Sequence, residues 1–513
     1  MKFSSFVLFI SMMICDWPVI GGDVPEILFQ EDFNRPQSVN NWQRCYGMEY
    51  RASDGIGGSG CVSFTYSEAN NGICLTSLDM KKAAGRGIVL EGMLKGENIT
   101  TPEKKYLGPK LMIHLKSPYG EFWLDQTKKY GSYDWQKFTI FARIPPDVEK
   151  LDIGIGLQGC TGKLLVDNLK ITFLPEVTDY SHGAAGLSSP LQKTPSLRGV
   201  MVGTMTEKDI GELADVWHAN LIRYQIANFP REDISDCTRY VEWVNRKLKK
   251  MDEVIAFCGK SGIKVLIDLH AGPAAKQDTA LSNYLNWTVE SQDTLVKVWE
   301  SISAKYKDSP AVWGYDILNE PREDNYVYES GGALDWNRLA ERVAVAIRKI
   351  DPDKPIIVEP AQWGTPYGLH VFKPFPVKNI VYSVHFYEPA EFTHQGIDGY
   401  PAGVIYPGTI AGKKWDKAML RQKLQPVVDF QRKYHVPIYV GEFSAPRWAP
   451  GAAQWLQDSI ELFEENGWDW SYHAFREYDG WSLEHEGSVK KAVHSDDNDR
   501  KRVVLKFFAK NTR

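Results

Sequence analysis

The chain has 513 residues, of which 43% are hydrophobic and 24% charged, and its formal net charge is −5. This composition is typical of a soluble globular protein and excludes disordered, collagen-like and multi-span membrane proteins. The length predicts several domains, or one large barrel with a smaller module. No run of Lys and Arg stands out, so we expect no nucleic-acid partner. The 17 Trp, 24 Tyr and 22 Phe indicate either a large core or a surface on which sugar rings stack.

The first 22 residues have the pattern of a signal peptide. Met1 and Lys2 precede an apolar run from Phe6 to Ile14, which is too short to cross a bilayer. A buried N-terminal strand is one alternative, and a lipid anchor at Cys15 is another. We expect a secreted protein, extracellular or periplasmic, with no membrane span.

The cysteines fit that compartment. Seven are present, and removal of Cys15 with the signal leaves six, an even number that suits an oxidising environment. No pair has CxxC spacing, so we expect no structural zinc site. No cluster of His, Asp and Glu has metal-ligand spacing either, and we predict neither a metal nor another cofactor.

Residues 24–175 are predicted to form an all-β sandwich of short strands. Alternating runs such as 137–141 and 163–173 are separated by Gly, Asn and Pro turns, and no long helical period interrupts them. The stretch from Tyr133 to Leu169 resembles the jelly-roll carbohydrate-binding modules of secreted glycosidases. Residues 176–195 contain few large apolar side chains and several Gly, Ser and Pro, which predicts a linker.

The pattern changes to alternating strands and helices over residues 196–513. Residues 240–258 place apolar side chains at steps of three and four, and an apolar strand follows at 263–269. Eight such strands are predicted, a number that favours a (β/α)8 barrel: Gly199–Thr204, Leu221–Ile226, Lys264–Leu269, Val312–Leu318, Pro355–Glu359, Ile380–His385, Pro437–Gly441 and Asp469–Phe475. A doubly wound open sheet is the alternative, but no Gly-rich phosphate loop follows any strand.

Polar side chains recur where these strands end, which is where the active site of such a barrel lies. Two glutamates close buried strands: Glu320 follows the fourth and Glu442 the seventh. Hydrolysis of a glycosidic bond requires a pair of carboxyl groups, one as acid and one as nucleophile or base. The other polar residues at strand ends are Arg223, His270, Asn319, His385 and Tyr387.

These residues, with the segment Ile317-Leu318-Asn319-Glu320-Pro321, resemble the active-site pattern of glycoside hydrolase family 5. The resemblance covers residues 197–490. It implies that Glu320 is the acid/base and Glu442 the nucleophile, which Arg223 and Tyr387 orient and keep ionised. It also implies that Asn319 binds the sugar 2-hydroxyl and that His270 and His385 line the subsite of the sugar that reacts.

The chain departs from this family at the eighth strand. A Trp usually ends that strand beneath the reacting sugar, and residues 470–481 have none at that point. We expect Trp481, through a loop that folds back, or Phe475 to take this place. Trp363, after the fifth strand, is a further candidate for sugar stacking.

The sequence thus predicts a secreted, monomeric, retaining endo-β-glycosidase that acts on a polysaccharide, with a β-1,4-glucan favoured. β-Mannan, xyloglucan and β-1,3-glucan remain alternatives because the same barrel serves all of them. A carbohydrate-binding protein without activity is a further alternative. The presence of both glutamates argues against it.

Overall fold

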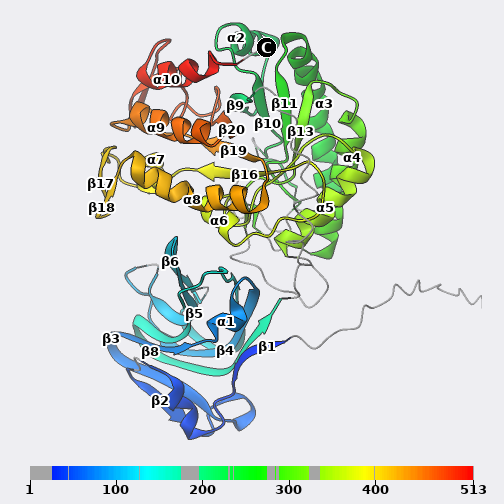
Figure 1. The fold of residues 1–513 in the computed structure, drawn as a ribbon. Coiled ribbons are helices and arrows are strands. Elements are labelled where there is room, and N and C mark those ends of the chain that lie inside the picture. Colours follow the sequence, from blue (N-terminus) through cyan, green and yellow to red (C-terminus); the bar gives the residue numbers. More distant parts are fainter. Residues whose placement is uncertain are drawn as a thin grey trace, which may run out of the picture.

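The protein consists of a strand-rich N-terminal module and a C-terminal barrel (Figure 1). The computed structural model describes residues 26–43, 46–104, 106–125, 127–174, 196–228, 231–234, 236–273, 283–284, 288–322, 335–397 and 399–511. The predicted signal peptide, Cys15 and the predicted linker lie outside these residues. Each module has its own hydrophobic core. None of the helices described in these ranges has the length and apolar character needed to cross a membrane.

Eight strands of the N-terminal module form one hydrogen-bonded network. They are β1 (Ile27–Glu31), β2 (Met48–Arg51), β3 (Cys61–Ser77), β4 (Gly87–Ile99), β5 (Gly108–Ser117), β6 (Gly120–Asp125), β7 (Gly131–Arg143) and β8 (Lys150–Phe173). The short helices η1 (Pro36–Asn41), η2 (Ile56–Gly58) and α1 (Met80–Ala83) join them. This arrangement confirms the all-β prediction.

The strands of this module are longer than the sequence predicted. β8 has 24 residues and pairs with β1, β3, β4 and β5. The sequence predicted turns at its glycines. Gly156, Gly159 and Gly162 instead lie inside the strand, with positive φ angles of 153°, 63° and 112°. Glycine takes such angles at no steric cost, so the strand bends without losing its partners.

The barrel is closed by eight parallel strands in the order predicted by a (β/α)8 fold. They are β9 (Arg198–Val202), β10 (Leu221–Gln225), β11 (Lys264–Asp268), β13 (Val312–Asp316), β15 (Ile356–Val358), β16 (Ile380–Phe386), β19 (Ile438–Phe443) and β20 (Asp469–Tyr472). Each corresponds to one of the eight predicted strands, so the barrel prediction is confirmed. The doubly wound alternative is wrong because β9 and β20 pair and close the sheet.

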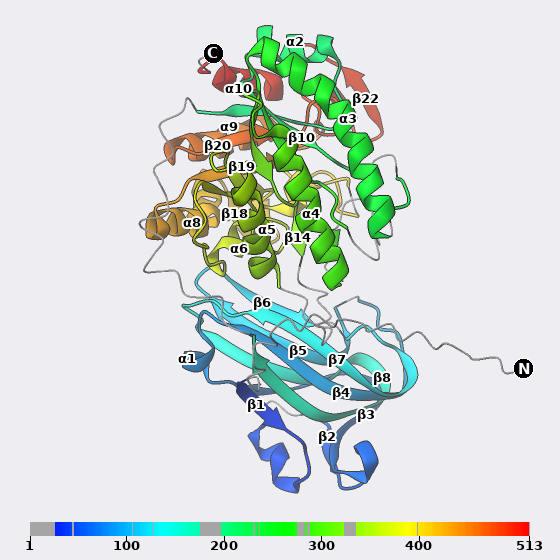
Figure 2. The same ribbon diagram turned by 90° about the vertical axis from the view of Figure 1, so that its right-hand side faces the viewer.

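Helices surround these strands (Figure 2). They are α2 (Glu207–Asp215), α3 (Cys237–Ser261), α4 (Val289–Tyr306), α5 (Trp336–Ile350), α6 (Pro366–His370), α7 (Ala390–Thr393), α8 (Lys417–Tyr434), α9 (Ala452–Glu465) and α10 (Asp499–Phe508). Short strands lie in the loops: β12 (Asn283–Tyr284), β14 (Pro321–Arg322), β17 (Gly408–Ile410), β18 (Lys413–Trp415), β21 (His485–Ser488) and β22 (Lys491–His494). As predicted, α3 buries an apolar face, and it ends at Gly262, whose φ is 73°.

The cysteines that the structure describes are not paired with one another. The five described cysteines are Cys61, Cys74, Cys160, Cys237 and Cys258. Cys45 lies outside the described residues. The even number of cysteines therefore does not correspond to disulfides among these five.

The two modules are in contact, and β6 lies below α6 in Figure 2. The ring of Phe122 in β6 packs on that of Tyr367 in α6, with centroids 4.2 Å apart. The guanidinium of Arg143, at the end of β7, donates to Asp335 at 2.7 Å; the side chain of Asp335 is buried and that of Arg143 is 11% exposed. Asp335 is the N-cap of α5 and accepts from the backbone N–H of Arg338. A charge of the sandwich therefore neutralises the cap of a barrel helix.

We predict that Arg143→Ala destabilises the protein by about 1.5–3 kcal/mol, the range for a hydrogen bond to a charged group. Burial raises the pKa of Asp335, but Arg143 and Arg338 outweigh it and hold that pKa below its usual value. The stabilisation of the fold by the ionised Asp335 is therefore present near neutral pH, and it is lost as the pH falls through the pKa of Asp335 in the folded state. Calorimetry at pH 7 and pH 3 should show a smaller difference between the two proteins at pH 3.

The matched control is Arg239→Ala. Arg239 pairs with Asp233 and Asp236 at the surface, where all three side chains are more than half exposed. Such pairs contribute at most about 1 kcal/mol. Equal effects of the two substitutions would show that the contact between the modules adds nothing to stability.

Candidate active site

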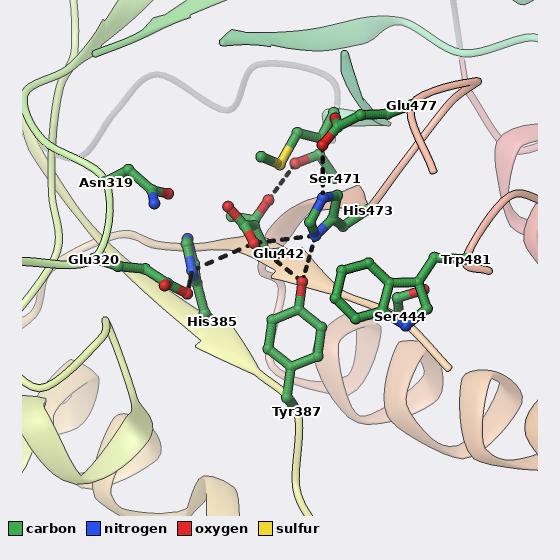
Figure 3. Close-up of polar contacts among 12 residues, drawn as sticks. Asn319, Glu320, His385, Tyr387, Glu442, Ser444, Ser471, His473, Glu477 and Trp481 are labelled. Carbon is green, nitrogen blue, oxygen red and sulfur yellow. Dashed lines mark hydrogen bonds and ion pairs between the residues drawn. The ribbon is translucent and has the colours of Figure 1, made fainter. Parts of the chain in front are cut away.

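The predicted site residues gather at the carboxyl ends of the barrel strands (Figure 3). Glu442 lies in β19, beside His385 of β16 in the register of the parallel pair. Gly441 makes this close approach feasible, because a Cβ atom there would lie 2.9 Å from His385 Nε2. Asn319 and Glu320 follow β13 and face these residues across the barrel mouth.

The side chain of Arg223 is the centre of the polar network. It is fully buried in β10 and contacts four carboxylates: Asp316 at 2.8 Å, Glu442 at 2.7 Å, Glu359 at 3.0 Å and Asp268 at 3.2 Å. It also donates to the Oδ1 atom of Asn319 at 3.0 Å. Burial lowers the pKa of Arg223, but these carboxylates raise it well above its usual value. The guanidinium therefore stays charged and fixes the ends of several strands.

Glu442 is held in its ionised form. One oxygen accepts from Arg223, and the other accepts from the Tyr387 hydroxyl at 3.0 Å. The side chain is 5% exposed, so burial raises its pKa. The charges of His385 and His473 outweigh that effect and lower the pKa of Glu442 well below its usual value.

The surroundings of Glu320 favour its protonated form instead. Burial raises its pKa, and the negative charges of Glu442 and Glu359 add to that effect, while the hydrogen bond from His385 opposes it. Its Oε1 atom lies 2.7 Å from His385 Nδ1, and its side chain is 22% exposed. Glu320 is held in the left-handed region with φ 44°, and its backbone N–H donates to Glu359 at 2.8 Å. The two glutamates therefore favour different protonation states, as an acid and a nucleophile or base require.

The remaining predicted residues occupy different positions. His270 follows β11 and is oriented by Asp268, whose Oδ2 atom lies 2.8 Å from its Nδ1. Trp363 is 44% exposed and has the guanidinium of Arg322 at 4.1 Å from its ring centroid. No contact between Trp363 and either glutamate is present among the described residues.

The sequence left open whether Trp481 or Phe475 follows the eighth strand beneath the reacting sugar, and the two residues lie in different surroundings. The loop after β20 folds back, so that the ring of Trp481 stacks on Tyr387 with centroids 5.8 Å apart (Figure 3). Phe475 packs edge-on against Trp217, beside α2, with ring centroids 5.1 Å apart. Directly after the strand, His473 lies 3.2 Å from Glu442.

Three residues that contact the predicted site residues or each other were missed by sequence reasoning: Glu359, His473 and Glu477. Glu359 ends the fifth predicted strand, and the rule that identified Glu320 and Glu442 could have found it. His473 follows the eighth strand, where the resemblance directed attention to a missing Trp. Glu477 lies on a loop whose path the sequence does not specify.

One group of side chains among the described residues has the spacing of a metal site: donor atoms of Glu320, His385 and Glu442 lie within 4.8 Å of one another. A metal ligand must be deprotonated. Burial lowers the pKa of His385, but Glu359 and Glu442 raise it well above its usual value, which favours the imidazolium over a ring that binds a metal. This arrangement suits proton transfer between the glutamates and a substrate better than it suits a cation.

Comparison with known proteins places this geometry in a family. Residues 184–479, more than half of the chain, match the cellulase family, glycosyl hydrolase family 5. The chain belongs to this family. It is therefore a glycoside hydrolase, and the family predicted from the motif around Glu320 is confirmed.

Individual relatives are distant. Endoglucanase C of Acetivibrio thermocellus is 25% identical over 300 residues, which cover 52% of this chain and 84% of that protein. Cellodextrinase A of Ruminococcus flavefaciens is 25% identical over 268 residues, covering 51% and 75%. Among solved structures, Cel5A of Thermotoga maritima in complex with cellobiose is 23% identical, with a TM-score of 0.46, and covers 64% of this chain and 100% of its own.

Proposed function

We propose that this family 5 hydrolase is a secreted, retaining endo-β-glycosidase that acts on a β-1,4-glucan. The observation that carries the proposal is the pair Glu320 and Glu442, which have opposed protonation preferences and oxygen atoms within 4.8 Å of each other. Retaining glycosidases hold their carboxyl groups about 5–5.5 Å apart, whereas inverting enzymes separate them by roughly 6.5–9.5 Å to admit a water molecule. The short separation favours retention.

In the first step, the ionised carboxylate of Glu442 attacks the anomeric carbon. The bond from that carbon to the leaving oxygen breaks, and Glu320 transfers its proton to this oxygen. The products are a glycosyl ester on Glu442 and a carboxylate at Glu320. Because the departing oxygen receives this proton, the leaving group departs as a neutral hydroxyl and carries no negative charge.

In the second step, the Glu320 carboxylate takes a proton from water as the water oxygen attacks the anomeric carbon. The ester bond breaks, which returns Glu442 to its ionised form and Glu320 to its protonated form. Two inversions give a product with the β configuration of the substrate. Arg223 and Tyr387 stabilise the negative charge of Glu442 through hydrogen bonds each time that carboxylate is released from the ester.

The other predicted residues have binding roles in this proposal. Asn319, held by Arg223, is placed to bind the sugar 2-hydroxyl, and His270 and His385 line the subsite of the reacting sugar. Trp481, stacked on Tyr387, provides an aromatic face at the rim of that subsite. Trp363, which is 44% exposed, would contact another sugar of the polymer.

The glucan assignment is supported by the names of the relatives, an endoglucanase and a cellodextrinase. β-Mannan, xyloglucan and β-1,3-glucan are the competing substrates. Secretion rests on the N-terminal pattern, and a role of the sandwich in binding polysaccharide stays a prediction. An inactive carbohydrate-binding protein is the competing function.

A reducing-sugar assay on purified polysaccharides separates these alternatives. We expect release of new chain ends from carboxymethyl cellulose or mixed-linkage β-glucan, and at least a thousandfold loss in Glu442→Gln, because the variant lacks the nucleophile. Faster hydrolysis of mannan, xyloglucan or laminarin would reassign the substrate. Binding without hydrolysis on every polymer would establish the inactive binding protein.

Glu320→Gln tests the acid. Glycosides with poor leaving groups need a proton at the departing oxygen, whereas dinitrophenyl glycosides leave without one. We therefore expect a loss of kcat/KM of roughly a thousandfold on cello-oligosaccharides and less than about tenfold on dinitrophenyl cellobioside. Similar losses on both substrates would exclude Glu320 from this role.

A 2-deoxy-2-fluoro cellobioside with a good leaving group tests the nucleophile. Fluorine slows both steps, so the glycosyl-enzyme accumulates. Intact mass should increase by one fluorocellobiosyl unit, and peptide mapping should place it on Glu442. Proton NMR of a normal reaction should show the β anomer first; an initial α anomer would indicate inversion, with Glu442 as a base for water.

A further inference from the structure

His473 follows the eighth barrel strand and contacts the Oε2 atom of Glu442, whereas Arg223 contacts its Oε1 atom. Its ring is buried, with 9% exposed, and both of its nitrogens have partners (Figure 3). Nδ1 lies 2.6 Å from the Tyr387 hydroxyl oxygen and 3.2 Å from Glu442 Oε2. Nε2 lies 3.4 Å from Glu477 Oε1. His473 therefore connects the loop carboxylate of Glu477 to the nucleophile.

Glu477 is itself held in place. Its Oε2 atom accepts a hydrogen bond from the side-chain amide of Gln225, at the end of β10, at 2.5 Å. Its side chain is 33% exposed, so one end of the connected set of residues reaches solvent. The order of contacts is Gln225, Glu477, His473, Tyr387 and Glu442.

The number of protons in this set determines what Tyr387 can do. The Tyr387 hydroxyl has one proton and two neighbouring acceptors, Glu442 Oε2 and, when it is unprotonated, His473 Nδ1. In a neutral His473 with its proton directed at Glu477, Nδ1 takes the Tyr387 proton and Glu442 loses that donor. In a protonated His473 both nitrogens donate, so the Tyr387 proton is left for Glu442.

We propose that Glu477 and His473 are positioning residues: Glu477 keeps His473 in the imidazolium form, and the imidazolium directs the Tyr387 proton to Glu442. The proposal rests on the proposed role of Glu442 as nucleophile. No proton leaves the set during the reaction, because Glu442 loses its charge to the ester bond and regains it when water opens that bond.

The charges around His473 favour its imidazolium form. Burial lowers the pKa of His473, but Glu442 from β19 and Glu477 from the loop after β20 raise it to about 10. The other charged groups nearby are His385 of β16, which faces Glu442, and His270 after β11, whose charge lowers the pKa of Glu477. Because the pKa of His473 is raised, its effect is present at neutral pH and is lost as the pH rises through that value.

The charge of His473 can be measured without any activity. The chain contains 11 His, so [13C]histidine labelling with His473→Gln for assignment identifies the Cε1–H signal of this ring. We expect this signal to remain at the imidazolium position up to about pH 9, and Glu477→Gln to lower its titration midpoint by at least one pH unit. A neutral His473 at pH 7 in the unaltered protein, or the same midpoint in both proteins, would overturn the proposal.

The matched control is Glu300→Gln, which removes an exposed carboxylate from α4. It should leave the His473 signal at its original position. A shift equal to that in Glu477→Gln would mean that net charge alone, and not the contact with Glu477, sets the pKa of His473.

The consequence for catalysis is measured with dinitrophenyl cellobioside, because departure of this group needs no proton from Glu320. In Glu477→Gln, we expect the ratio of kcat/KM at pH 9 to that at pH 6 to fall at least about twofold, since a one-unit shift leaves about half of His473 neutral at pH 9 and Glu442 loses a hydrogen bond in that half. Tyr387→Phe should abolish this additional pH dependence of Glu477→Gln. A uniform loss at every pH would assign Glu477 a merely structural role and overturn the proposal.

Failure of the proposed function gives a different result. If the unaltered enzyme hydrolyses no glycoside, or if the fluoro sugar labels a residue other than Glu442, the nucleophile is misassigned. The NMR titration still decides whether Glu477 holds His473 charged. An active enzyme labelled at Glu442, with no pH-dependent effect of Glu477→Gln, refutes the positioning role alone.

Discussion

The active site depends on one buried cation. Arg223 has no contact with solvent, yet its guanidinium touches carboxylates from β11, β13, β19 and the end of β15. A charged group is expensive to bury unless it is paired and hydrogen-bonded, and each of these carboxylates would be equally costly alone. The buried charges are therefore stable only where these strand ends lie together around Arg223. The position of Glu442 follows from this condition, as does that of Asn319.

The same cluster separates the proton affinities of the two glutamates. Glu442 lies on the cationic side, with Arg223 and two histidines around it, whereas Glu320 lies farther from Arg223 and next to two carboxylates. Burial raises the pKa of both, so neighbouring charge and not depth decides which one is ionised. A single environment therefore favours different protonation states of the two glutamates, as the proposed acid and nucleophile require.

Much of this arrangement could be predicted from the sequence, because parallel barrel strands end at one rim and polar residues after apolar strands are easily recognised. The rule identified Arg223, His270, Glu320, His385 and Glu442, all of which meet at the barrel mouth. It fails where position depends on loops. Trp481 reaches Tyr387 only because the chain returns over β20, and Glu477 reaches His473 by the same return. The sandwich strands were underestimated for another reason: glycines that read as turns allow β8 to bend without ending.

The contact between Arg143 and Asp335 has a consequence for how such enzymes diversify. Directly after Asp335, the indole of Trp336 donates to the carbonyl of Glu359, whose carboxylate accepts from the backbone of Glu320. These hydrogen bonds, joined by the peptide bond between Asp335 and Trp336 and by Glu359 itself, connect the sandwich to Glu320. Exchange of the N-terminal module by recombination would leave Asp335 facing a foreign surface. Modules of this kind should consequently be inherited together with their barrel, and the residues at positions 143 and 335 should vary as a pair across related chains.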